Sequence, residues 1–144
     1  MRIVFIGPPG AGKGTQCRRL AEYLDVPHLS TGEMLRQTRE DSSLGKLVAS
    51  YIDNGQLAPD NLVVPIVTKR LAEPDCRDGC LFDGFPRTVN QAEMLDQYLV
   101  DDGDPLDLVI HLDVPEDELI GRLLRRAEIE NRADDTREAI AKRL

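Results

Sequence analysis

At 144 residues the chain is long enough to bury the core of one domain without disulfides or a metal. A formal net charge of −8 argues against nucleic acid and membrane surfaces as partners, because both attract proteins through a positive field. The sequence has neither an apolar run of transmembrane length nor a signal segment. We therefore expect a soluble protein in the cytoplasm, and as a separate expectation we take it to be a monomer.

The cysteines and the basic residues indicate which kinds of site the chain can form. Cys17, Cys76 and Cys80 are an odd number, and no second Cys/His pair completes a zinc site, so we expect reduced thiols. Most of the 18 basic residues are arginine, whose planar fork grips phosphate oxygens bidentately. This bias favours a small phosphorylated ligand, although an arginine-rich genome would produce it too.

The first thirty residues predict a strand, a loop and a helix. Residues 2–6 are apolar and rich in β-formers, while 7–12 combine Gly and Pro in a run that fits neither helix nor strand. From Lys13 to Leu24 apolar residues recur at helical spacing. A second short strand is expected at 27–29.

The rest of the chain alternates helices with strands. Ser30 offers an N-cap, and two short helices are expected within 31–54. The following helix, strand, helix, strand and helix are expected at 61–72, 80–83, 88–100, 106–114 and 115–126. This alternation predicts an α/β fold, a parallel sheet with helices on both faces, whose ligands bind at the carboxyl ends of the strands.

The run from Gly7 to Thr15 has the spacing of a phosphate-binding P-loop, Gly-x4-Gly-Lys, with Gly14 where the general motif has Ser or Thr. Its bare backbone N–H groups can wrap phosphate oxygens, and the following helix N-terminus adds partial positive charge. Lys13 supplies a full charge. An ordinary Gly/Pro turn would not explain a lysine at this position.

Two further clusters suit phosphate chemistry. Asp83 ends a buried strand where a carboxylate can hold Mg²⁺ through water, although a turn aspartate before a glycine is common. Arg122 and Arg126 are four residues apart on one predicted helix face, where two guanidinium groups repel unless an anion lies between them. Neutralisation by Glu118 and Glu128 is the alternative.

Several segments together resemble the adenylate kinase family. They are the P-loop from Gly7 to Thr15, the run Leu29-Ser-Thr-Gly-Glu-Met-Leu-Arg36, and the run Asp83-Gly-Phe-Pro-Arg-Thr88 with Gln91. The resemblance extends from residue 1 to 144 and is to the short-lid form of the family. It implies a P-loop NTPase-like sheet, a helical AMP-binding insertion, ATP, AMP and ADP as ligands, Mg²⁺ with ATP, and no zinc.

The resemblance also implies roles for individual residues. Those for catalysis are Lys13, Arg87, Arg122, Arg126, Arg132 and Arg143. Those for ATP are Gly10, Ala11, Gly12, Lys13, Gly14, Thr15 and Arg122. Those for AMP are Thr31, Arg36, Gln56, Leu57, Ala58, Gly84, Phe85, Pro86, Arg87, Gln91, Arg132 and Arg143. His28 and His111 are interpreted as core or sheet-edge residues, because the ionised phosphate of AMP needs no catalytic base.

The same resemblance divides the chain into functional segments. They are a core with the P-loop at 1–29, an AMP-binding insertion at 30–59, further core at 60–126, a short lid at 127–135 and a core helix at 136–144. That last helix has no stop signal, and the family has a fifth strand after it. We therefore expect an incomplete core of marginal stability and weak nucleotide affinity, with the apolar edge of strand 106–114 open to association.

Two alternatives remain open. UMP/CMP kinases share the P-loop and the Gly-Phe-Pro-Arg run but usually have alanine where this chain has Thr31, so Thr31 and Gln91 favour adenine. A nucleotide-binding module without turnover is the second alternative.

Overall fold

A computed structural model describes residues 1–37, 46–48, 50, 51, 54, 56–130, 138, 140 and 141 of the chain. Its centre is a parallel four-stranded sheet in the order β2-β3-β1-β4. The strands are β1 (Arg2–Ile6), β2 (His28–Ser30), β3 (Cys80–Asp83) and β4 (Leu108–His111). All four predicted strands are present, and the α/β fold is confirmed.

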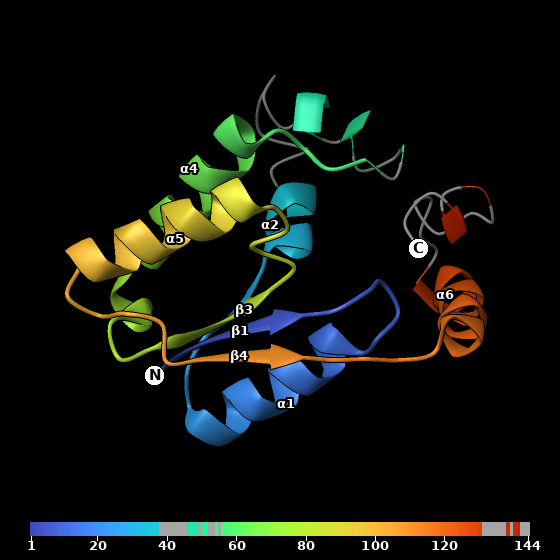
Figure 1. Cartoon of the computed structure of the whole chain (residues 1–144), viewed down its shortest axis with the longest axis horizontal. Coiled ribbons are helices and arrows are strands. Elements are labelled where there is room, and N and C mark those ends of the chain that lie inside the picture. The colour runs from blue at the N-terminus through green and yellow to red at the C-terminus, as the bar shows by residue number, and fades with distance from the viewer. Residues whose placement is uncertain are drawn as a thin grey trace.

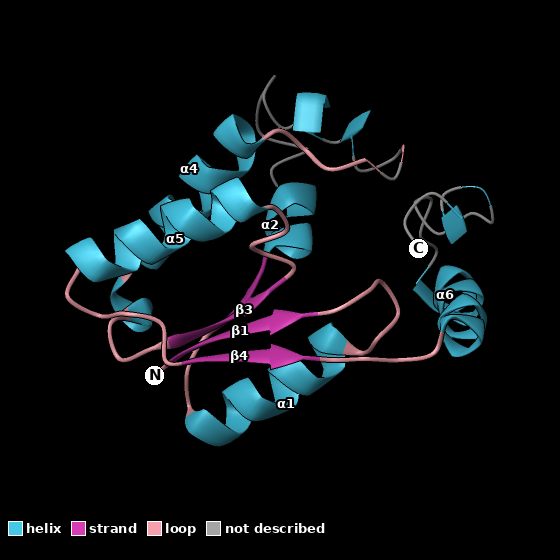
Figure 2. Cartoon of the chain, viewed as in Figure 1, coloured by secondary structure: helices cyan, strands magenta, loops and turns pink. Residues whose placement is uncertain are grey.

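Helices cover both faces of this sheet (Figures 1 and 2). They are α1 (Lys13–Leu24), α2 (Thr31–Gln37), α4 (Asp60–Leu71), α5 (Val89–Asp101) and α6 (Glu116–Glu130), with a 3-10 turn at Pro74–Cys76. Helix α1 lies against one face, and α4 and α5 lie over the other (Figure 1). The predicted N-cap at Ser30 is confirmed, since its hydroxyl accepts from Glu33 N. Thr88, predicted as the first residue of its helix, is instead the N-cap of α5, and its hydroxyl accepts from Gln91 N.

The side chains of β1 point alternately to the two faces of the sheet, and each face has its own hydrophobic core. Ile3 and Phe5 face α1 and pack with Cys17 and Ala21. Val4 faces the opposite way, into the larger core that α4 and α5 close. Because side chains alternate between the faces of a strand, this one strand serves both cores.

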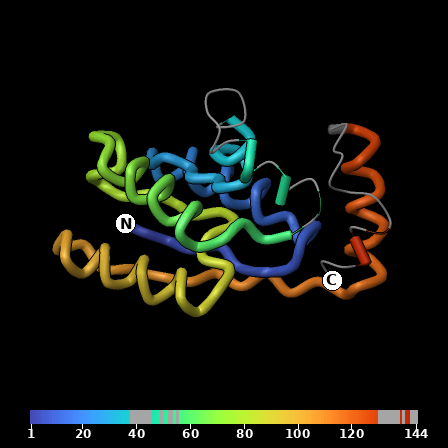
Figure 3. The backbone as a smooth tube through the Cα atoms, turned by 90° about the horizontal axis from the view of Figure 1, so that it is seen from above, coloured from blue at the N-terminus to red at the C-terminus, as the bar shows by residue number. Residues whose placement is uncertain are grey.

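Helix α6 is the longest helix and stands at one end of the molecule, across the strand direction (Figure 3). It buries Leu119 and Leu123. A Cβ on Gly10 would lie 3.0 Å from Leu123 Cγ, so α6 packs directly on the P-loop. The helix predicted at 115–126 is longer than expected: it continues to Glu130, into the segment predicted as a lid, because Ala and Glu there favour helix. Residues 131–135 lie outside the described part.

Strand β4 forms one edge of the sheet. Its residues pair with β1 on one side only, from Ile3 with Leu108 to Ile6 with His111. Leu108 is 51% exposed and Val109 is 48% exposed. The strand is shorter than the predicted 106–114, but the expected open apolar edge is present.

A buried arginine ties the N-terminus to the loop before β4. Arg2 is 4% exposed, and its guanidinium forms ion pairs with Asp104 and, at 3.7 Å, with Asp102. Its backbone N–H donates to Asp107 Oδ2 over 2.6 Å. Arg2 therefore belongs to the scaffold and lies away from any phosphate ligand.

All three cysteines are buried and free. Burial raises the pKa of both Cys17 and Cys80 to about 12, so neither thiol ionises at neutral pH. Within the described ranges no helix is long and apolar enough to cross a membrane.

Candidate active site

A cleft of about 1190 Å³ opens at the carboxyl ends of β1, β2 and β3. The loop after each of these strands contributes to its wall, and α6 closes one side with Arg122 and Arg126. This is the edge of a parallel sheet where the helices' N-termini and the connecting loops meet. The cleft therefore lies where the alternating pattern predicted a ligand.

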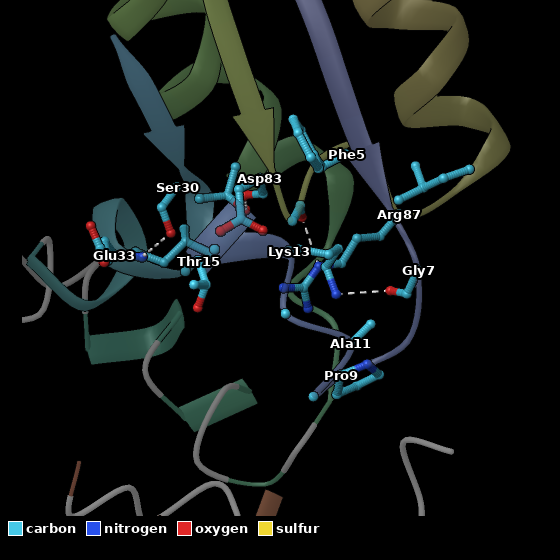
Figure 4. Close-up of a pocket in the computed structure, with 18 of the residues that line it drawn as sticks. Phe5, Gly7, Pro9, Ala11, Lys13, Thr15, Ser30, Glu33, Asp83 and Arg87 are labelled. Atoms are coloured by element: carbon cyan, nitrogen blue, oxygen red, sulfur yellow. Dashed lines mark hydrogen bonds between the residues drawn. The ribbon is translucent and has the colours of Figure 1, made fainter. Parts of the chain in front are cut away.

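The P-loop forms the floor of one half of the cleft. Gly10 and Gly12 have φ angles of 83° and 94°, a left-handed conformation that glycine adopts without strain. The Lys13 ammonium reaches back over the loop and donates to the carbonyl of Gly7 at 2.8 Å (Figure 4) and to that of Pro8 at 2.9 Å. A lysine thus lies above backbone N–H groups at the start of α1, where an anion is favoured.

Asp83 lies beside the P-loop at the end of β3. A Cβ on Gly14 would lie 3.1 Å from Asp83 Oδ2, so the glycine in this variant motif leaves room for the carboxylate. The same oxygen lies 3.3 Å from His28 Nε2. His28 is on the edge strand β2, as expected, but it also lines the cleft, which sequence reasoning missed.

The other half of the cleft is built around the turn after β3. Thr31 Oγ1 donates to Asp83 O at 3.3 Å, and Arg87 Nε donates to Gly84 O at 2.7 Å. Gly84 has a φ of 79°, and a Cβ there would lie 3.0 Å from both Thr31 Oγ1 and Arg87 Nη2. Only glycine therefore allows the threonine and the arginine to meet over this turn.

Gln91 projects into this half from α5 and is held by two hydrogen bonds. Its Oε1 accepts from Arg87 N at 2.8 Å, and its Nε2 donates to Asp60 Oδ1 at 2.6 Å. Asp60 also accepts from Asn90 at 2.7 Å, and this bond, followed by that from Gln91, lowers the Asp60 pKa. Sequence reasoning missed Asp60; its signal was an acid at the first helical position after Pro59.

The arginines of the site have protein partners. Arg36 folds back over Gly32, where a Cβ would lie 3.3 Å from Arg36 Nη1. Arg122 donates to Glu118 over 2.9 Å, the neutralisation that was the alternative to an anion. Both arginines nevertheless line the cleft with Arg87 and Arg126.

The cleft brings together most of the predicted site residues. Those that line it are Gly10, Ala11, Gly12, Lys13, Gly14, Thr15, Thr31, Arg36, Gln56, Leu57, Ala58, Asp83, Gly84, Pro86, Arg87, Gln91, Arg122 and Arg126. Phe85 does not line the cleft: it is 1% exposed and packs in the core, so its part in AMP binding stays a prediction. Arg132 and Arg143 lie outside the described residues.

Comparison with known proteins decides the family. A family profile described as adenylate kinase matches residues 5–144. The chain belongs to the adenylate kinase family. It is 54% identical to an adenylate kinase of Rhodopirellula baltica over 99% of this chain and 73% of that protein.

Other adenylate kinases are similar over the same extent. The one from Cyanothece sp. is 48% identical, over 99% of this chain and 74% of its own length. The one from Thermobifida fusca is 50% identical, over 100% of this chain and 77% of its own length. The chain thus spans about three quarters of these curated adenylate kinases, and the resemblance to the family is confirmed.

Proposed function

We propose that the chain catalyses reversible phosphoryl transfer between ATP and AMP, giving two ADP. One observation carries the proposal: a single cleft has a P-loop in one half and the cluster of Thr31, Arg87 and Gln91 in the other. The first half suits a polyphosphate, and the second suits a phosphate joined to a base. Membership of the adenylate kinase family supports the same assignment.

The reaction requires two phosphates in line. An oxygen of the AMP phosphate forms a bond to the γ-phosphorus of ATP while the bond to the β,γ-bridging oxygen breaks, and that electron pair leaves with ADP. No proton moves, since the attacking oxygen is already ionised. Catalysis then rests on positioning and on positive charge beside the transferred group.

Charged residues around the cleft supply these two effects. Lys13 and the P-loop amides hold the ATP phosphates once phosphate oxygens replace the carbonyls of Gly7 and Pro8 as acceptors. Arg36 and Arg87 hold the AMP phosphate. Arg122 and Arg126 approach the transferred group from α6, joined by Arg132 and Arg143.

A magnesium ion fits beside Asp83. Among the described residues no group of three or more His, Cys, Asp or Glu could hold a metal ion. Mg²⁺ bound to nucleotide phosphates needs only one or two carboxylates, because it keeps several waters. Asp83, next to Gly14, would hold it through water, and the ion would neutralise phosphate charge.

Closure would exclude water, which could otherwise accept the phosphoryl group. We assign this role to the insertion at 30–59 and to the lid at 127–135. The cytoplasmic location and the monomeric state remain predictions.

A coupled assay of ADP formation tests the proposal. We expect ADP from ATP with AMP as acceptor, and much slower formation with UMP or CMP. Comparable rates with CMP would transfer the assignment to UMP/CMP kinases. Binding of ATP and AMP without turnover would leave only a nucleotide-binding module.

A further inference from the structure

We propose that Asp60 is a positioning residue that sets the base specificity of the AMP site by fixing the orientation of the Gln91 carboxamide. This inference deepens the proposed function and rests on it. Asp60 is the first residue of α4 and is not among the residues that line the cleft. It therefore acts on a bound base through Gln91.

The Asp60 carboxylate collects donors from the start of α5. Its Oδ1 accepts from Gln91 Nε2 at 2.6 Å, and its Oδ2 accepts from Asn90 Nδ2 at 2.7 Å. Thr88 Oγ1 lies 3.4 Å from both oxygens. The N-termini of α4 and α5 are thereby joined behind the cleft wall.

Chemistry fixes which end of the Gln91 amide faces which partner. An ionised carboxylate can only accept a hydrogen bond, so the side facing Asp60 must be the NH₂ group. The Arg87 backbone N–H can only donate, so the side facing it, at 2.8 Å, must be the carbonyl oxygen. A flipped amide would oppose donor to donor and acceptor to acceptor. The orientation therefore follows from the partners themselves.

A locked carboxamide presents a defined pattern to the cleft. Nε2 retains one N–H and Oε1 retains one lone pair, and Gln91, which is 2% exposed, lines the cleft. An adjacent donor and acceptor match adenine, which offers an amino group beside a ring-nitrogen acceptor. Hypoxanthine carries a carbonyl oxygen at position 6 and N1–H, which reverses the pattern.

The orientation of the Gln91 amide thus determines which base the site prefers. When the buried polar groups of a site form hydrogen bonds with one base, they lose those bonds with a base of the reversed pattern. Such sites discriminate strongly between the two bases. Without Asp60, only Arg87 N would orient the amide, and a flipped form would accept the reversed pattern at the cost of one hydrogen bond. The ratio of AMP to IMP use should therefore fall.

The test compares AMP with IMP as acceptor, with ATP as donor, in the wild type and in Asp60→Ala. We expect kcat/KM for AMP over that for IMP to fall about tenfold, the equivalent of one hydrogen bond, with the KM for ATP unchanged. Asn90→Ala is the matched control, because it removes an exposed partner of the same carboxylate and leaves Gln91 in place. Its ratio should stay at the wild-type value.

A purely structural role would lower AMP and IMP use together. An unchanged ratio in folded Asp60→Ala, or an equal fall in Asn90→Ala, would overturn the proposal. If Asp60→Ala does not fold, Asp60→Asn replaces it: an asparagine of the same shape can accept from or donate to Gln91, so the ratio should again fall, and an unchanged ratio again overturns the proposal.

The results that would contradict the proposed reaction differ from those that would contradict the role of Asp60. A folded wild type that produces no ADP from ATP and AMP would remove the reaction, whereas titrations of AMP and IMP against the wild type and Asp60→Ala would still measure the selectivity of the site. Equal AMP-to-IMP affinity ratios in the two proteins would overturn the role of Asp60 alone.

Discussion

At the scale of single residues, two cations of the cleft donate hydrogen bonds to backbone carbonyls. Lys13 donates to Gly7 and Pro8, and Arg87 donates to Gly84. These contacts keep each cation near its loop, and phosphate oxygens can replace the neutral carbonyls as stronger, charged acceptors.

Lys13→Met should abolish phosphoryl transfer and leave the fold intact. The substitution removes a charge from the phosphate site, where loss of one electrostatic contact slows reactions about 10²- to 10³-fold, and opens no core cavity. Initial rates of ADP formation and a thermal melt measure the two effects. Lys69→Met, at an exposed position of α4, is the control. Near-normal turnover in folded Lys13→Met would remove the P-loop assignment.

Arg87→Ala and Arg36→Ala should weaken AMP binding far more than ATP binding. Each removes a charge-assisted contact of about 1.5–3 kcal/mol from one half of the cleft only. Separate titrations with AMP and ATP provide the measurement, and the exposed Arg77→Ala serves as control. Equal losses for both nucleotides would contradict two separate half-sites.

The sequence predicted residues that would contact a ligand through a charged side chain or through the backbone of a glycine loop. It did not predict Asp60, which holds another side chain in place. Lys13 and Asp83 are visible from local spacing alone, because each ends a strand or a glycine run. Asp60 supports a side chain 31 positions away, and no local pattern encodes that distance. The burial of Phe85 in the core was not expected, because a motif gives residue order, whereas the direction of each side chain depends on the turn.

At the scale of elements, the P-loop is supported by α6 as well as by β1 and α1. Gly10 lies against Leu123 and the Leu119 carbonyl, which a Cβ would approach to 3.0 Å and 3.3 Å. The glycine that exposes backbone to phosphate therefore also allows the loop to pack on the helix that carries Arg122 and Arg126. The sequence predicted both elements but not their contact, which depends on the path of the chain after β4.

Gly10→Ala should destabilise the protein more than Gly103→Ala. Both glycines have left-handed φ angles, 83° and 80°, so each alanine costs about 1–2 kcal/mol of backbone strain. Only Gly10 is crowded, since a Cβ on Gly103 meets nothing within 4 Å. Crowding should add roughly 1–3 kcal/mol to the loss, measured by urea unfolding. Equal losses would show that α6 does not press on the loop.

At the scale of the whole molecule, one cluster of opposite charges joins the beginning of the chain to the loop before β4. Hydrogen bonding from Arg2, reinforced by its charge, lowers the pKa of Asp104 below its ordinary value of 3.8. A carboxylate with a lowered pKa in the folded state contributes stability above that ordinary value, and the contribution is lost as the pH falls through the folded pKa.

Asp104→Asn should therefore flatten the decline of the melting temperature below about pH 4. The amide does not titrate, so the variant should be less stable than the wild type at pH 7 and should approach it in acid. Melting curves at several pH values between 2 and 7 are the measurement. Asp96→Asn, an exposed change on α5, should follow the wild-type profile. A parallel profile in Asp104→Asn would exclude the contribution.

The open edge of β4 should make the chain associate as its concentration rises. Val109→Lys places a charge on this edge, which blocks strand pairing between molecules, and should keep the protein monomeric. Val100→Lys is the control, because Val100 is similarly exposed, at 53%, but lies on α5. Sedimentation across a concentration series distinguishes them. Wild type that stays monomeric throughout would contradict the prediction.

The sequence predicted the order and kind of the described strands because each is short and has Gly, Pro or Asp on at least one flank, and three of the four are mainly apolar. It did not give the lateral order of the sheet, in which β1 lies between β3 and β4. Element ends also differed where stop signals were weak: α6 was expected to end near 126 and continues to Glu130. The strand order depends on how the elements pack together, and the extra turn of α6 depends on the helix propensity of residues 127–130.

The central place of β1 has a consequence for synthesis on the ribosome. Residues 2–6 emerge first, yet Arg2 pairs with Cys80 and Ile3 pairs with Leu108, so both neighbours of this strand are made much later. Until then its apolar side chains have no sheet to join, and transiently exposed apolar segments of this kind are prone to aggregate. Strand β4 follows the other three described strands in the sequence, so the second flank of β1 cannot be covered until residues 108–111 have left the tunnel.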